Sequence, residues 1–207
     1  RDLAVWFAML FGLCAYVAGH FMPNTWVLRD GRFYVDSNIT LMEDFSYEER
    51  FARSWYEENL GWNRNLDAGW SNVALGARGE LYHFRPYLLP VMAEPFFFAF
   101  GILGVLLFNM LCYAVILGGA YRFGARFAGR RAAAAATALW VFGTSLVETL
   151  YDYSVDALLL ALFVGALELL QRRRGMLAGL CIAGTLVIKP TALLYAPAAV
   201  ALITHLP

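Results

Sequence analysis

Long apolar runs separated by short charged loops constrain this chain more than any other feature of its sequence. The first run covers 3–21, and further runs follow one another from residue 87 to the end. A helix of about 20 mostly apolar residues spans the hydrocarbon of a bilayer. Only 15% of the residues are charged, against roughly 25% in a soluble domain. The pattern predicts an all-α, polytopic membrane protein and excludes a disordered chain, a disulfide scaffold and an ordinary water-soluble enzyme.

We expect about six membrane spans, with a large outer loop between the first and the second. Pro90 and Pro95 interrupt the second apolar run, so we expect a short interfacial piece over 87–98 before the second span. Lys189 and Pro190 divide the last two spans, because one continuous helix would leave a lysine near mid-membrane, at a cost of about 2.5–3.5 kcal/mol. The expected spans are 3–21, 99–121, 132–150, 155–171, 176–188 and 191–203.

The charges divide the chain into three parts. The first helix occupies 1–27, an extracytoplasmic loop with short helices occupies 28–86, and a helical bundle occupies 87–207. Ten of the sixteen acidic residues lie in the loop. The chain begins on Arg1 without a methionine and ends after about six spans, so we expect it to be a fragment of a longer chain.

The basic residues predict one orientation. Short loops rich in lysine and arginine stay in the cytoplasm. Two such loops follow the second and fourth spans, and both are cytoplasmic if the chain starts inside; they carry Arg122, Arg126, Arg130 and Arg131, and then Arg172, Arg173 and Arg174. The outer loop then lies outside. Acidic and basic residues balance at 16 each, so no net charge attracts the chain to nucleic acid.

This orientation gathers ionisable residues on the outer side of the membrane. Such residues at a membrane boundary are candidates for a functional site. Asp152 and Asp156 share a face if the fourth helix begins early, and two like charges repel there unless a cation lies between them. The candidates are Asp30, Asp36, Asp44, His83, Arg85, Asp152, Asp156 and Lys189.

Several of these candidate residues also have a purely structural explanation. Asp30 also fits a turn, Asp152 also fits a helix cap, and the acidic cluster of the loop fits a solvated helical face. The tripeptide from Asn38 to Thr40 fits a glycosylation acceptor, a match that is common by chance. Glu94 is costly near the bilayer unless an arginine pairs with it. No P-loop, GxGxxG, GxSxG or HExxH motif occurs, so nucleotide, acyl-serine and zinc-protease chemistry gain no support.

Several short stretches occur in a recognisable order. An aspartate–glycine–aromatic stretch covers 30–34, and a glycine-rich stretch bounded by proline covers 79–86. An acidic turn at 151–156 and a basic–proline–threonine stretch at 186–191 follow. This order resembles the N-terminal half of the polytopic glycosyltransferases of the GT-C superfamily. The paired acids of the mannosyltransferases in that superfamily are absent, because Asp30 is followed by glycine.

The resemblance implies a transferase of the cell envelope, in the bacterial inner membrane. It would move a sugar from a polyprenyl-phosphate donor to an acceptor on the extracytoplasmic face. Asp30 would act as general base, with Asp36 as second candidate, and Lys189 and Arg85 would hold the lipid phosphate. A divalent metal at Asp152 is left open, although paired ligands are not evident. The remaining residues of the expected substrate site are Tyr82, His83, Asp152 and Asp156.

Two other functions stay open. The chain is alternatively a non-catalytic membrane subunit of a larger complex, which docks a partner protein through the outer loop. A transporter is disfavoured, because the charges collect on one face and not at the midplane. The aromatic residues of the loop suit the headgroup layer, sugar rings or prenyl chains. The expected partners are therefore membrane lipids, a polyprenyl-phosphate-linked sugar and other membrane subunits.

Overall fold

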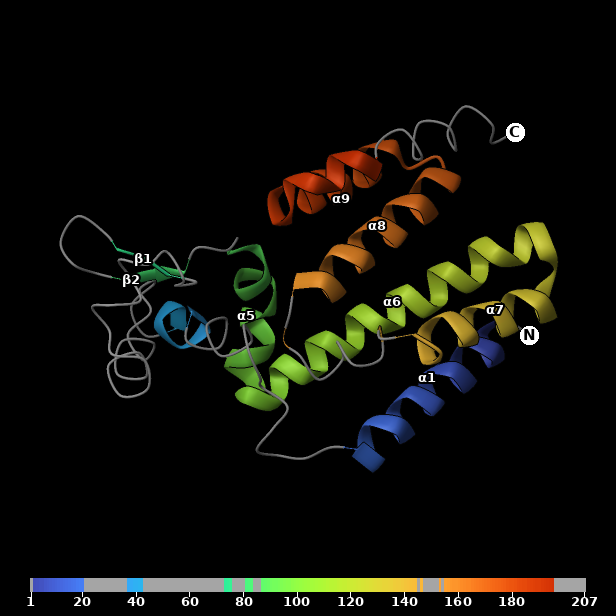
Figure 1. The fold of residues 1–207 in the computed structure, drawn as a ribbon, viewed down its shortest axis with the longest axis horizontal. Helices are drawn as coiled ribbons and strands as arrows, with labels where there is room; N and C mark the ends of the chain where they lie inside the picture. Colours follow the sequence, from blue (N-terminus) through green and yellow to red (C-terminus); the bar gives the residue numbers. More distant parts are fainter. Residues whose placement is uncertain are drawn as a thin grey trace.

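The computed structural model describes residues 2–20, 37–42, 73–75, 81–83, 87–144, 146, 153 and 155–195. Within these ranges the protein is helical apart from one antiparallel pair of three-residue strands, so the expected all-α class is confirmed there. A short helix covers 37–42. The other elements are α1 (Asp2–His20), β1 (Val73–Leu75), β2 (Leu81–His83), α5 (Leu88–Phe100), α6 (Ile102–Ala128), α7 (Arg130–Phe142), α8 (Val155–Gln171), α9 (Gly175–Ile188) and the 3-10 helix η2 (Pro190–Tyr195) (Figure 1).

Helix α6 forms the centre of the bundle. It packs against α5, α7 and α8 and also contacts α1, while α9 packs against α8 on the far side from α6 (Figure 1). Its stretch Leu103–Ala128 is the one helix in the described part of the chain that is long and apolar enough to cross a membrane. The other five expected spans therefore stay predictions.

Two adjacent glycines bring α1 and α8 close to α6. A Cβ atom on Gly118 would lie 2.9 Å from Nε1 of Trp6, and one on Gly119 would lie 2.2 Å from Cγ1 of Val164. The Trp6 indole N–H donates a hydrogen bond of 3.0 Å to the carbonyl of Ala114. Small residues allow helices to approach this closely, and they fix the point at which three helices meet.

Apolar side chains cover much of the outside of the bundle. Phe11 on α1, Leu139 on α7 and Met176 on α9 are 76%, 72% and 80% exposed. Polar side chains such as Thr137 and Thr185 are buried between the helices instead. An exposed apolar surface of this extent marks contact with lipid or with another protein.

The boundary between α5 and α6 differs from the expected one. Pro90 and Pro95 both lie inside α5, and the chain turns at Gly101, which has a φ of +57°. Pro90 is tolerated because the first N–H groups of a helix have no partner within the helix. A Cβ on Gly104 would lie 1.9 Å from the carbonyl oxygen of Phe96. The short piece expected before the second span thus corresponds to α5, and it ends at Phe100 and not at residue 98 because Gly101 allows the turn.

The third and sixth expected spans are described only in part. Helix α7 ends at Phe142, well before the expected end at residue 150, and 147–150 lie outside the described residues. Beyond Pro190 the chain forms η2 rather than an α-helix, and 196–203 lie outside the described residues. Helices α1, α8 and α9 follow the expected boundaries within one residue.

The two ends of the bundle carry different charges. The α6–α7 and α8–α9 connections lie together at one end, on the right of Figure 1, and we call this the arginine end. Its basic residues are Arg122, Arg126, Arg130, Arg131, Arg172, Arg173 and Arg174. At the opposite end, where α8 begins and α9 ends, lie Asp156 and Lys189, and we call this the lysine end.

Candidate functional site

Lys189 stands at the end of α9 because Pro190 stops the helix there. A residue that precedes proline is pushed out of the helical region, and Lys189 has an extended backbone with a φ of −141°. Its backbone N–H still donates to the carbonyl of Thr185 at 2.9 Å. The lysine side chain therefore leaves the bundle at a fixed point of the lysine end.

The ammonium of Lys189 donates a hydrogen bond to Oδ1 of Asp156 in the first turn of α8. The two side chains are 43% and 53% exposed, and ion pairs this exposed contribute at most about 1 kcal/mol to stability. An ammonium group has three N–H donors. The pair thus holds the cation in place and leaves it accessible to an anionic ligand.

A buried amide connects three segments at the lysine end. The side chain of Asn38 is fully buried in the 37–42 helix. Its Nδ2 donates to the carbonyl of Pro90 at 2.9 Å and to Oε2 of Glu94 at 2.6 Å. Its Oδ1 accepts a bond of 2.9 Å from the hydroxyl of Tyr153. The amide uses both donors and its acceptor, so it fixes the 37–42 helix against α5 and the start of α8.

Glu94 is paired with this amide, and a pairing with an arginine stays a prediction. Burial raises the pKa of the Glu94 carboxyl above its usual range, and the hydrogen bond from Asn38 offsets this only in part. A carboxyl with a raised pKa takes up a proton more readily, which is the property that a general base requires. Glu94 thus joins the carboxyl groups at the lysine end that can accept a proton.

The structure brings together two of the eight predicted site residues, Asp156 and Lys189. The ammonium of Lys189 is a cation beside Asp156, and the expected cation between Asp156 and Asp152 stays a prediction. Two more residues belong to β2, which pairs with β1 and of which only the backbone is described: Tyr82 and His83. The other four lie outside the described residues: Asp30, Asp36, Arg85 and Asp152. Their roles stay predictions.

The network of Asn38 and Tyr153 was missed from the sequence. The tripeptide at Asn38 fits a glycosylation acceptor only as a chance match, since the Asn38 side chain has no exposed surface in the folded chain. Tyr153 stands in an acidic turn with no local sign of burial. The available signal was Glu94, because a carboxyl in an apolar helix needs a polar partner.

No group of three or more metal-ligating side chains lies together in the described part of the chain. The carboxylates of Glu94 and Asp156 each accept a hydrogen bond from a nitrogen atom. The divalent metal considered for Asp152 stays a prediction, because that residue lies outside the described ranges.

Comparison of the chain with protein-family models, with curated proteins and with solved structures found no match. The function is therefore inferred from the residues of the lysine end. They offer an accessible cation on α9 and a carboxyl with a raised pKa on α5. The accessible cation suits an anionic ligand, and the carboxyl on α5 is a second ionisable group at the same end of the bundle.

Proposed function

We propose that the chain is a multi-pass membrane protein of the bacterial inner membrane. The large apolar side chains exposed on α1, α7 and α9 support this, because contact with lipid removes the cost of exposing them to water. The arginines expected in two loops lie at the end of α6, at the start of α7 and between α8 and α9, and these three places share the end of the bundle opposite Lys189. With the arginine end in the cytoplasm, the lysine end faces outward.

The lysine end binds the phosphate of a polyprenyl-phosphate-linked sugar, and the chain belongs to the membrane part of a glycosyltransferase of the GT-C type. The observation that carries this proposal is the ion pair at the lysine end, in which Asp156 holds the exposed ammonium of Lys189. A charge-assisted hydrogen bond to a leaving phosphate contributes roughly 1.5–3 kcal/mol. Arg85 is the second proposed cation, and Tyr82, His83 and Asp152 complete the proposed substrate site.

In the proposed reaction an acceptor hydroxyl attacks the anomeric carbon of the sugar. The new carbon–oxygen bond forms as the bond to the phosphate oxygen breaks, and the lipid phosphate leaves with the electron pair. The carboxylate of Asp30 takes the hydroxyl proton, with Asp36 as the alternative base. A general base in this position contributes about 10²–10⁴-fold to the rate.

The test is transfer of a radiolabelled sugar by membranes that contain the full chain. The donors are polyprenyl-phosphate mannose and polyprenyl-phosphate aminoarabinose. Asp30→Asn is expected to lower the rate by about 10²–10⁴-fold. Lys189→Met is expected to lower it by about 10–100-fold, and Lys189→Arg to retain most of it, because the arginine keeps the positive charge. Arg131→Gln, at the arginine end, is the control and leaves transfer unchanged.

A different outcome supports the subunit function instead. If Asp30→Asn and Lys189→Met both keep the wild-type rate, the transferase proposal is wrong. Co-purification of a stable partner protein, together with a lack of polyprenyl-phosphate binding, then identifies the chain as a non-catalytic subunit.

A further inference from the structure

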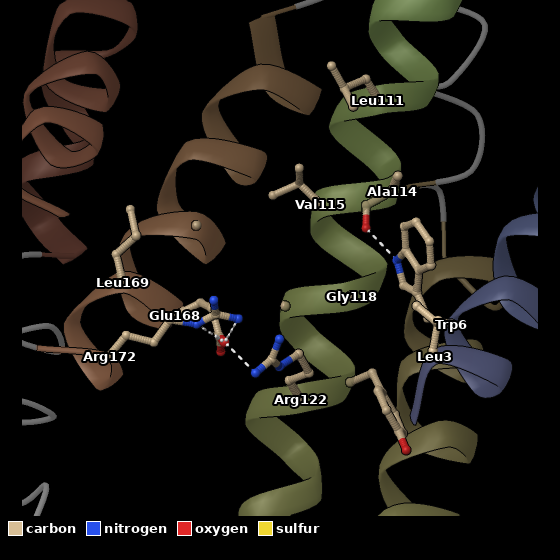
Figure 2. Close-up of a pocket in the computed structure, with 13 residues that line it drawn as sticks. Leu3, Trp6, Leu111, Ala114, Val115, Gly118, Arg122, Glu168, Leu169 and Arg172 are labelled. Atoms are coloured by element: carbon tan, nitrogen blue, oxygen red, sulfur yellow. Dashed lines mark hydrogen bonds and ion pairs between the residues drawn. The ribbon is translucent and has the colours of Figure 1, made fainter. Parts of the chain in front are cut away.

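A groove runs along α6 at the arginine end, between α1 and α8 (Figure 2). It has a volume of about 750 Å³, and its floor includes the glycines Gly118, Gly119 and Gly165. Leu111 and Val115 line its apolar part and are 49% and 40% exposed. The groove is therefore open along its length to whatever surrounds the bundle.

The groove ends in a charged cluster of Glu168 with two arginines (Figure 2). Nη2 of Arg122 lies 3.1 Å from Oε1 of Glu168, and Nη2 and Nε of Arg172 each lie 2.8 Å from the same oxygen. The Glu168 side chain is 14% exposed, whereas those of Arg122 and Arg172 are 50% and 44% exposed. The carboxylate thus lies at the base of the cluster, and both guanidinium groups face outward.

The cluster carries an excess of positive charge. One carboxylate neutralises one of the two guanidinium groups, and Nη1 of each arginine makes no hydrogen bond to the described residues. Glu168 is the one described acidic side chain that lines the groove. The surrounding basic residues are Arg126, Arg130, Arg131, Arg173 and Arg174. The open end of the groove is therefore suited to an anion.

The length of the groove matches one leaflet of a bilayer. Leu111 and Arg122 are eleven residues apart on one helix, which is roughly 16 Å at 1.5 Å per residue. Half of a hydrocarbon core of about 30 Å is roughly 15 Å. An acyl chain that starts at the arginines would reach Leu111 at about the level of the midplane.

We propose that this groove binds an anionic glycerophospholipid of the leaflet at the arginine end. Its phosphate lies against Arg122 and Arg172, whose planar guanidinium groups bind phosphate oxygens in pairs. One acyl chain lies past Gly165 and along Leu111 and Val115. Basic pockets between membrane helices are known to bind anionic headgroups in this way. The site is separate from the proposed sugar-donor site at the lysine end.

The test measures, by native mass spectrometry, how tightly the full chain in detergent binds phosphatidylglycerol and phosphatidylcholine. Wild type is expected to prefer phosphatidylglycerol. Arg122→Gln/Arg172→Gln is expected to weaken its binding by about tenfold or more. The matched control, Arg126→Gln/Arg131→Gln, removes the same charge from the same end but leaves the groove intact. It is expected to change binding by less than about threefold.

A second variant tests the apolar part of the groove and retains every charge. A Cβ on Gly165 would lie 3.9 Å from Cγ1 of Val115, which is an ordinary contact. Gly165→Leu therefore fills the groove without a clash at the backbone, and it is expected to weaken phosphatidylglycerol binding by about tenfold. Glycerol phosphate, which has no acyl chain, is expected to bind this variant as it binds wild type.

Three outcomes overturn the proposal. Wild type binds the two phospholipids equally, the two double variants lose affinity equally, or Gly165→Leu binds phosphatidylglycerol as tightly as wild type. The Gly165→Leu result stands even where the arginine double variant does not fold, because in that variant Glu168 keeps both of its cations.

Discussion

The two ends of the helical bundle hold their charged groups by different means. At the lysine end, a fully buried amide bonds to three partners, and the one described ion pair is half exposed. At the arginine end, a single carboxylate holds two guanidinium groups within an excess of arginine. The lysine end is thus fixed by hydrogen bonds that depend on geometry, whereas the arginine end is defined by charge. Substitutions at the two ends should therefore affect different properties.

The largest effect is expected from the buried amide. Asn38→Ala removes the hydrogen bonds to the Glu94 carboxyl, the Tyr153 hydroxyl and the Pro90 carbonyl, and a hydrogen bond contributes about 0.5–1.5 kcal/mol, or more where one partner is charged. We expect the free energy of unfolding to fall by about 3 kcal/mol or more, measured by denaturant unfolding in detergent. Arg126→Gln, an exposed substitution at the arginine end, should change it by less than about 0.5 kcal/mol. Equal losses in the two variants would remove the contrast between the ends.

A somewhat smaller effect is expected between the two ends, where α6 crosses α8. The Cβ of Gly119→Ala would meet Cγ1 of Val164 at 2.2 Å, and such overpacking costs about 1–3 kcal/mol. Gly165→Ala on the facing helix meets only an ordinary contact and serves as the control. The measurement is the midpoint of thermal unfolding. A normal midpoint for Gly119→Ala would mean that the close approach of α6 and α8 does not depend on a glycine at this position.

A pH dependence is expected from the lysine end. The pKa of Glu94 in the folded chain is raised above the ordinary value of 4.5, so the folded state binds this proton more tightly than the unfolded state. Its stabilising contribution is fully present below pH 4.5 and is lost as the pH rises through the raised pKa. Wild type should therefore lose stability over this window relative to Glu94→Gln. Parallel pH profiles of the two proteins would contradict the assignment.

The smallest effect on stability is expected at the exposed ion pair. Asp156→Asn removes the partner of Lys189 but leaves both side chains accessible to solvent. The free energy of unfolding should fall by less than about 1 kcal/mol in the same denaturant experiment. A loss as large as that of Asn38→Ala would show that the pair is structural and would weaken its proposed role in ligand binding.

Much of the helical architecture could be predicted, because apolar runs and their charged ends are local features. Helix α8 covers the residues expected for the fourth span, and α9 ends before Lys189 because proline follows it. The break between α5 and α6 was misplaced, because the turn depends on how closely the backbones of Gly104 and Phe96 approach. The glycines at 101 and 104 are visible in the sequence, but the distance between the two backbones is set by tertiary packing.

The candidate site was predicted less completely. Lys189 and Asp156 were found from their charge and their place at the ends of apolar runs. The network around Glu94 was not found, because its partner Asn38 is 56 residues away along the chain and Tyr153, which donates to Asn38, is 115 residues from it. Contacts at such a separation follow from the tertiary fold. Burying an asparagine or a tyrosine costs less free energy than burying a charged group, so neither residue type by itself indicates a buried partner.

The shortness of α9 has a consequence for the depth of the lysine end. Its 14 residues measure about 21 Å, roughly 9 Å less than the hydrocarbon of a bilayer. On the proposed orientation, with Arg174 among the inner headgroups, Lys189 lies beneath the outer headgroups and not level with them. The membrane thins around such a helix, or water fills a recess above it. Lys189 would then contact the phosphate of a lipid-linked substrate within the outer leaflet, below the membrane surface.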